Sequence, residues 1–353
     1  MTQDFLTLAS SAEPASRTNY HVSGVIWASV FVVVLIALAL DLFVFNRHEH
    51  EISMKEAAIA SCFWIALGIG FGVHVYFDIS GQAASQYFQA YVLEKSLSVD
   101  NLFVIALLFS YFSVPKIYQH RVLYWGVIGA LIFRGIFIAL GAVLISKFEF
   151  VLAIFGVILL LSAYKMAFSS HDAVDPEKNP LLKIMRKRMR MTKDYDGKKF
   201  FTKIKGIRYA TPLFAVLLIV ETTDVVFAFD SIPAVFGISS DPFIVFSSNA
   251  FAILGLRSLY FLIAGLLGKF EALKYGLSFI LAFIGIKLML GVIIDWHAPE
   301  WLSLGVIGVS LTVSIVYSLL RPVEHVEEVD HAGEGLELLD EEFQDPESDT
   351  SKS

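Results

Sequence analysis

Nine long apolar runs constrain this 353-residue chain more than any other feature. A helix needs about 20 apolar residues to cross the ~30 Å hydrocarbon core of a bilayer, and every run reaches that length. Helices are expected because a backbone polar group without a partner is costly in lipid. The sequence therefore predicts an all-α polytopic membrane protein with spans at residues 24–45, 57–77, 86–112, 122–145, 148–168, 212–236, 243–268, 275–294 and 301–320.

The composition excludes an ordinary soluble domain. Charged residues make up 17% of the chain, against about a quarter in soluble proteins, and 56% of the residues are hydrophobic. The single cysteine, Cys62, excludes a disulfide framework and a cysteine-based zinc site. The first 23 residues hold one basic residue, Arg17, and lack a small-residue cleavage site, so the first run is interpreted as a retained helix.

The distribution of Lys and Arg between connections predicts the orientation. Connections on one side hold 19 Lys and Arg, leaving out Lys352, whereas those on the other side hold two, Arg17 and Lys147. We therefore expect the N-terminus outside and the C-terminus in the cytoplasm. The basic side comprises residues 46–56, 113–121, 169–211, 269–274 and the chain from 321 onward.

An internal repeat relates residues 134–166 to residues 257–289. Both segments open with an arginine, continue to Lys-Phe-Glu, and carry a lysine sixteen residues after that glutamate. An aspartate precedes each arginine by 34 or 33 residues. The matched positions are Asp100 and Asp224, Arg134 and Arg257, 147–149 and 269–271, and Lys165 and Lys287.

This repeat predicts two units of three helices each. Because a unit with an odd number of spans ends on the opposite side of the membrane from its start, the second unit crosses the membrane in the opposite direction to the first. Inverted units of this kind are the plan of many secondary transporters, whose substrate sites lie near the midplane where the units meet. The predicted organisation is an extracytoplasmic N-terminus (1–23), peripheral helices (24–85), repeat unit one (86–168), a basic cytoplasmic loop (169–211), repeat unit two (212–294), a ninth helix (295–322) and a disordered acidic cytoplasmic tail (323–353).

Carboxylates inside two apolar runs are the candidate functional residues. An ionised carboxylate at the bilayer centre costs at least ~3 kcal/mol, so it needs a partner, a proton or a bound cation. The run at 86–112 carries Glu94 and Asp100 with the amide of Asn101 beside them, and the run at 212–236 carries Glu221, Asp224 and Asp230. Pro233 is expected to kink the second helix and bring Asp230 toward the other acids.

Oxygen ligands of this kind suit a hard divalent cation such as Mn²⁺, Mg²⁺ or Ca²⁺. We predict that the six residues named above form a metal site, and the absence of histidine and thiolate from these motifs counts against copper and zinc.

The alternative is structural salt bridging. Asp100–Arg134 and Asp224–Arg257 are natural pairs, and Lys95 could neutralise one acid. We interpret Lys95, Arg134 and Arg257 as charge-balancing residues rather than ligands, and Asp41, near the end of the first run, as a side chain that snorkels to the surface.

With these motifs in place, the chain resembles the TerC family of integral membrane proteins, in particular its Alx-type branch. The resemblance rests on "EKSLSVDNLFV" at 94–104 and "ETTDVVFAFDSIPAVF" at 221–236, and it covers roughly residues 24–321. It implies a bacterial inner membrane protein of a branch associated with manganese export, in a family named for tellurium resistance. It carries over Glu94, Asp100, Glu221, Asp224 and Asp230 as functional positions.

The expected function is export of a divalent cation in exchange for protons, and Mn²⁺ is the ion expected first among the three named above. No resident cofactor, enzymatic activity or nucleic-acid partner is expected. An intramembrane hydrolase is disfavoured because the chain has no His-Glu-x-x-His or Gly-x-Ser-x-Gly motif. The remaining alternative is a membrane scaffold for a metal or tellurite stress-response complex with protein partners. Deletion of residues 323–353 would discriminate, because a scaffold would lose its phenotype and a transporter would keep its flux.

Overall fold

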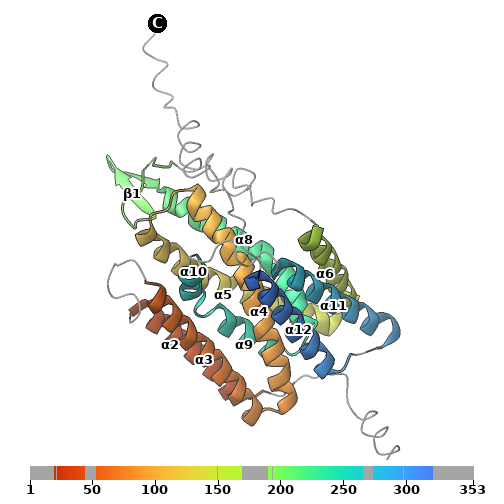
Figure 1. The fold of residues 1–353 in the computed structure, drawn as a ribbon. Helices are drawn as coiled ribbons and strands as arrows, with labels where there is room; N and C mark the ends of the chain where they lie inside the picture. The colour runs from red at the N-terminus through yellow and green to blue at the C-terminus, as the bar shows by residue number, and fades with distance from the viewer. Residues whose placement is uncertain are drawn as a thin grey trace, which may run out of the picture.

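The computed structural model describes residue 20 and residues 22–43, 53–148, 150–168, 190–192, 194–264, 273–296 and 298–320. This part of the chain is a helical bundle with one small β-hairpin at its end (Figure 1). The helices are α2 (Gly24–Phe43), α3 (Met54–Asp78), α4 (Gly81–Tyr111), α5 (Lys116–Lys147), α6 (Phe150–Phe168), α8 (Pro212–Phe236), α9 (Pro242–Ile253), α10 (Leu256–Ala264), α11 (Leu273–Ile294) and α12 (Glu300–Leu320), and the strands are β1 (Phe201–Ile204) and β2 (Ile207–Ala210).

The predicted fold class, an all-α polytopic membrane protein, is confirmed. Among the described residues, seven helices are long and apolar enough to cross a membrane, or eight if the bent pair α9 and α10 forms one span. Helix α4 is 31 residues long but carries Glu94, Lys95 and Asp100, and it is not among these seven. The count of nine spans therefore stays a prediction, as does the orientation of the termini. The acidic tail (323–353) lies outside the described residues.

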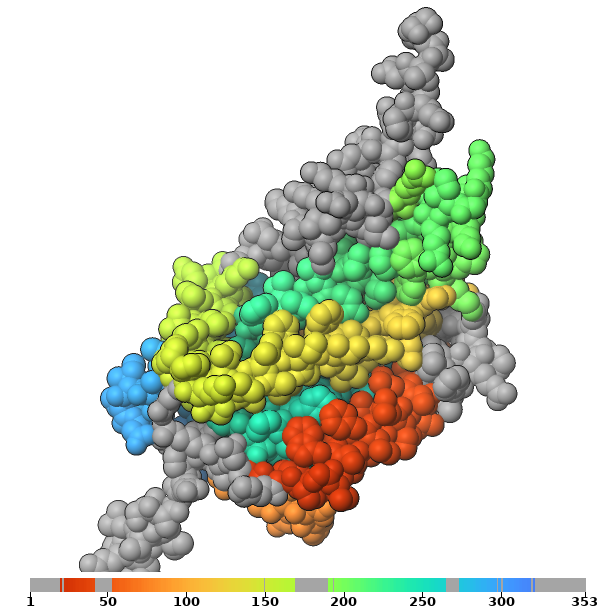
Figure 2. Space-filling view, turned by 180° about the vertical axis from the view of Figure 1, so that it is seen from behind, coloured from red at the N-terminus to blue at the C-terminus, as the bar shows by residue number. Residues whose placement is uncertain are grey.

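The helices of the two predicted repeat units interleave instead of standing side by side. Helix α4 runs through the middle of the bundle and contacts α8 and α9 (Figure 1). Helix α5, seen from the opposite side, lies between the same two helices (Figure 2). Side chains of α4, α5, α8 and α9 therefore meet in one interior region to which both units contribute.

Helices α6 and α11, which correspond to each other in the repeat, form the most extensive helix pair. A Cβ atom at Gly156 would lie 3.0 Å from the carbonyl oxygen of Gly285, and a Cβ at Gly285 would lie 3.0 Å from that of Gly156. Further along, the Ser278 hydroxyl donates to the carbonyl of Ala163 at 2.6 Å. The partner number falls as the α6 number rises, so the two helices run antiparallel, as inverted units require. Small residues at the crossing allow this close approach.

The predicted single span at 243–268 is wrong in one respect, because the chain breaks within it. Helices α9 and α10 meet at an angle of 46°. Leu254 leaves the helical conformation and Gly255 has φ of +78°, a left-handed backbone that favours glycine. Gly255 also packs directly on the Trp64 side chain of α3, which leaves no room for a Cβ atom. Both features explain why the helix ends and restarts at this point.

The end of the predicted basic loop (169–211) forms a β-hairpin in its described part. Lys205 and Gly206 have φ of +50° and +85°, the two consecutive left-handed residues of a tight two-residue turn. The Phe201 ring packs on Phe214 of α8 with centroids 4.6 Å apart. The Tyr195 hydroxyl donates to the carbonyl of Phe112, after the end of α4, and burial raises the pKa of Tyr195 so that it stays protonated. The hairpin region thus connects the end of α4 to the start of α8.

The α6–α11 crossing gives a stability prediction. Gly285→Val is expected to force the two helices apart, because added atoms would meet backbone at the crossing, and to lower the free energy of unfolding by about 1–3 kcal/mol. Gly305→Val on α12 is the matched control, since no atom lies within 4 Å of a Cβ at that position. Thermal unfolding in detergent measures both. Equal destabilisation of the two variants would contradict the role assigned to the crossing.

Candidate cation site

A buried arginine is the centre of the candidate site. Arg134 of α5 is 2% exposed and forms hydrogen bonds with residues of three other helices. Its guanidinium pairs with Glu94 of α4, contacts both carboxylate oxygens of Asp224 of α8 at 3.2 and 3.4 Å, and donates to the Asn249 side chain of α9 at 3.0 Å. Guanidinium geometry suits such a two-oxygen contact with a carboxylate. One cation therefore joins acids from both predicted repeat units.

Glu94 is the most deeply buried acid of the site, with 0% of its side chain exposed. One of its oxygens pairs with Arg134, and the other, Oε1, has no hydrogen-bond partner among the described residues. Ser98, one turn further along α4, likewise has a buried hydroxyl oxygen without a described partner. A buried polar atom without a partner is costly, so these two oxygens are available to a ligand.

Glu221 lies one turn before Asp224 on α8. Its carboxylate fills the space that Gly129 of α5 leaves open, since a Cβ atom at Gly129 would overlap the Glu221 oxygens. Its Oε2 atom is buried and has no hydrogen-bond partner among the described residues. The predicted grouping of Glu221 with Asp224 thus corresponds to two acids on the α5 side of α8.

Asn101 is buried and Asp100 is half-buried, both on α4 beyond Glu94. At ~100° per residue, Asp100 is turned about 120° from Glu94 around the helix, whereas Asn101 returns to the Glu94 side. The predicted Asp100–Arg134 pair is not among the hydrogen bonds of Arg134 in the described chain.

Asp230 lies away from the Arg134 group. It accepts a hydrogen bond from Ser162 of α6, and Lys165 of the same helix interacts with it electrostatically. Helix α8 continues through Pro233 to Phe236. Asp230 does not join the other acids as expected, because six residues after Asp224 its carboxylate contacts α6.

None of the three predicted charge-balancing residues has the partner that the sequence indicated, since Arg134 binds Glu94 and Asp224. The proposed Asp224–Arg257 pair is wrong, because Arg257 donates to the carboxylate and the backbone carbonyl of Asp41, at 2.9 and 3.0 Å. Asp41 is consequently buried and does not snorkel. Lys95 donates to the backbone carbonyls of Ala252 and Leu254 instead of neutralising an acid.

In the described part of the chain, no three His, Cys, Asp or Glu side chains lie close enough together to hold a metal ion. The guanidinium of Arg134 lies between Glu94 and Asp224 and supplies the positive charge there. In this conformation the site is thus a buried ion-pair network that includes the predicted ligands Glu94 and Asp224. The sequence analysis did not identify Asn249 and Ser162. The one feature that could have indicated a role for them is that they are polar residues inside apolar runs.

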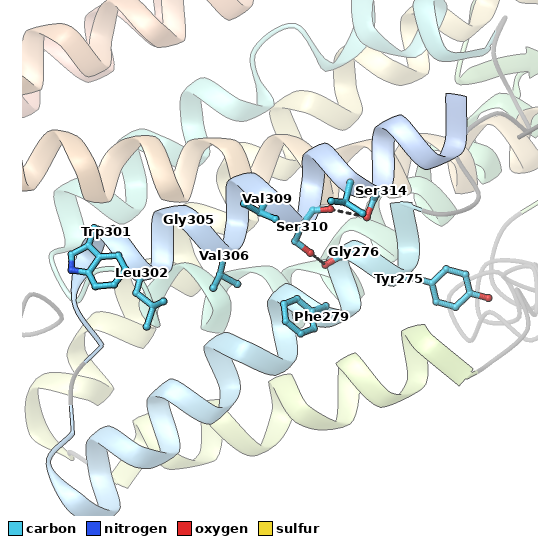
Figure 3. A pocket seen from close by; sticks show the side chains of 11 residues that line it. Tyr275, Gly276, Phe279, Trp301, Leu302, Gly305, Val306, Val309, Ser310 and Ser314 are labelled. Atoms are coloured by element: carbon cyan, nitrogen blue, oxygen red, sulfur yellow. Dashed lines mark hydrogen bonds between the residues drawn. The ribbon is translucent and has the colours of Figure 1, made fainter. Parts of the chain in front are cut away.

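A groove between α11 and α12 has a volume of about 590 Å³ but a different chemistry (Figure 3). Its wall is largely apolar, and the two serine hydroxyls in it donate to the backbone carbonyls of Gly276 and Ser310. None of the predicted ligands lines it. The groove therefore offers no site for a cation.

Comparison with known proteins places the chain in a family. The sequence model described as "Integral membrane protein TerC family" matches residues 79–324, which include the whole Arg134 network. No solved structure matches this chain.

Several proteins are 39–45% identical to this chain over the aligned residues. "Uncharacterized membrane protein STKORF319" from Myxococcus xanthus is 43% identical over 297 residues, covering 84% of this chain and 92% of that protein. "Putative membrane-bound redox modulator Alx" from Escherichia coli (strain K12) is 45% identical over 273 residues, covering 75% of this chain and 84% of that protein. An "Uncharacterized membrane protein" from Rickettsia bellii is 39% identical over 269 residues, covering 76% of this chain and 88% of that protein.

Removal of the buried cation gives a second stability prediction. Arg134→Met leaves the fully buried Glu94 carboxylate without its partner, and loss of one member of a buried pair costs about 3–5 kcal/mol. Adding Glu94→Gln to Arg134→Met removes the more deeply buried of the two uncompensated charges, the other being Asp224, so the double variant is expected to recover part of the loss. Chemical unfolding in detergent measures the series. Wild-type stability in Arg134→Met would rule out the network as described.

Proposed function

This chain belongs to the TerC family of integral membrane proteins, and from that premise we propose that it exports divalent metal cations, Mn²⁺ first among them, in exchange for protons. The observation that carries the proposal is the Arg134 network: a positive charge held between carboxylates of two interleaved halves, in the interior of a membrane bundle.

The ligand chemistry supports a hard cation. Glu94, Asp224 and Glu221 supply carboxylate oxygens, and Ser98 and Asn249 add neutral oxygens, with no sulfur or imidazole among these residues. Such oxygen sets suit Mn²⁺, Mg²⁺ and Ca²⁺. Three of these oxygens, on Glu94, Ser98 and Glu221, are buried and have no hydrogen-bond partner within the described part of the chain, which is unfavourable unless a ligand or a proton reaches them during the cycle.

Arg134 would then act as an internal substitute for the transported ion. A guanidinium and a divalent cation cannot occupy the same space between Glu94 and Asp224, so binding of the ion requires that the Arg134 side chain withdraw. A cation that remains in the protein offsets part of the negative charge of the acids when no ion is bound, which lowers the cost of the empty state in a low-dielectric interior. Asn249 holds the guanidinium from α9 and would set its resting position.

Proton exchange supports the return of the empty carrier. After release of a divalent ion, the site carries more negative charge than Arg134 alone balances, since Glu221 adds a third carboxylate beside Glu94 and Asp224. Protonated acids cross a low-dielectric region at lower cost than ionised ones. Uptake of protons by these acids would therefore complete the cycle.

The Alx relatives carry a name that includes redox modulation. In this chain Cys62 is the sole cysteine, and it lies exposed on α3. A thiol–disulfide couple within one chain takes two cysteines, so chemistry of that kind is excluded here. Our proposal includes no enzymatic step and no resident cofactor.

A flux assay tests the proposal. Purified protein reconstituted in vesicles is expected to move Mn²⁺ down its gradient with opposite movement of protons, and Glu221→Gln and Asp224→Asn should each reduce the initial rate at least tenfold. Asp196→Asn, on the exposed connection before the hairpin, is the matched control and should retain wild-type flux. A panel of Mn²⁺, Mg²⁺ and Ca²⁺ in the same assay gives the preference. Normal Mn²⁺ flux in both folded variants would refute the proposed site.

A further inference from the structure

The break between α9 and α10 exposes the carbonyl end of a half-helix inside the bundle. The last carbonyls of any helix have no partner within it, and the partial negative charge of the helix dipole is concentrated there. At this break the residues that carry these carbonyls are buried: Ala252 is 0% exposed and Leu254 is 2% exposed. A buried carbonyl end requires a donor or a cation from elsewhere in the protein.

Lys95 of α4 supplies that cation. Its ammonium donates to the carbonyl of Ala252 at 2.8 Å and to the carbonyl of Leu254 at 3.0 Å, bridging 157 residues of sequence in the first case. Among the described residues, Lys95 forms no ion pair with a carboxylate. Its positive charge is thus balanced by backbone oxygens and by the dipole of α9, not by an acid.

The same arrangement recurs where transporters bind a small coupling cation. In such proteins, Na⁺ or H⁺ is bound at a broken span, by the backbone carbonyls of the unwound segment and by the C-terminal end of a half-helix. In this chain an ammonium on a flexible stem takes that position. The geometry is that of a monovalent cation site in which the bound cation is the ammonium group of a lysine of the same chain.

The surroundings keep the carbonyl end in place independently of Lys95. Trp64 of α3 packs against Gly255 at the break, and the Ser61 hydroxyl of α3 lies 3.2 Å from that of Ser258 on α10. Arg257 of α10 is bonded to Asp41 of α2. Helices α2 and α3, expected to be peripheral, thus fix the broken span from the outside while Lys95 contacts it from the inside.

We propose that the carbonyl end of α9 is a monovalent cation site which the Lys95 ammonium fills, so that the wild-type protein needs neither Na⁺ nor K⁺ to hold the broken span. When the side chain is shortened, the vacated carbonyls take up Na⁺ or K⁺ in its place. This site is separate from the Arg134 network and does not depend on which ion the protein moves.

The test is the thermal stability of purified variants in detergent, titrated with NaCl or KCl against choline chloride at constant ionic strength. Lys95→Ala removes the stem and the charge, and its melting temperature is expected to fall in choline and to rise saturably by several degrees with Na⁺ or K⁺. Lys95→Met removes the charge but keeps the bulk of the stem, so it blocks the position and should be destabilised without responding to either ion. The wild type should not respond.

A Lys95→Ala variant that is equally stable in choline, Na⁺ and K⁺ would overturn the proposal. So would an equal response of all three proteins, because it would show a general salt effect. If Lys95→Ala cannot be purified in a folded state, Lys95→Ser is titrated in the same way with the same expected and contradicting results. A wild-type melting temperature that falls when choline replaces both alkali ions would overturn the proposal without any variant.

Discussion

A guanidinium buried between two carboxylates is the interaction on which the interior of this protein depends. Arg134 binds Glu94 on one side and Asp224 on the other, and these acids come from α4 and α8, the first helices of the two repeat units. In a low-dielectric interior each charge is tolerated because its partners are within hydrogen-bond distance. The same pairing explains how Glu94 and Asp224 are accommodated in the interior.

Two cationic residues of the first unit, Lys95 and Arg134, contact the broken span of the second unit. The bend between α9 and α10 leaves carbonyls that Lys95 satisfies, and Asn249, one turn before the end of α9, holds Arg134. Lys95 and Glu94 are adjacent in sequence, so neighbouring positions of α4 contact the break and the Arg134 network. A movement of α4 against α9 would alter both contacts together, and this provides a physical link between the two regions during any change of conformation.

The sequence predicted the class of fold and the region of the site, but not the partners within it. Apolar runs and the repeat are local patterns, and the antiparallel α6–α11 pair agrees with them. The partners of Arg134 and Arg257 could not be predicted, because the repeat suggests pairing within a unit. The interleaved helices instead bring Arg134 to Asp224 of the other unit, and Arg257 pairs with Asp41 of α2. Asp230 was misplaced because Pro233 lies near the end of α8, where it does not turn the preceding acid toward α5. Gly255 offered a signal for the break that the span prediction did not use.

The central claim is that Arg134 and a divalent cation exchange places between Glu94 and Asp224. A structure of the protein determined with Mn²⁺, with the metal located by its anomalous scattering, tests this most directly. The account predicts a metal peak between these two carboxylates, with the guanidinium withdrawn from at least one of them. A bound Mn²⁺ elsewhere, with both contacts of Arg134 intact, would contradict it.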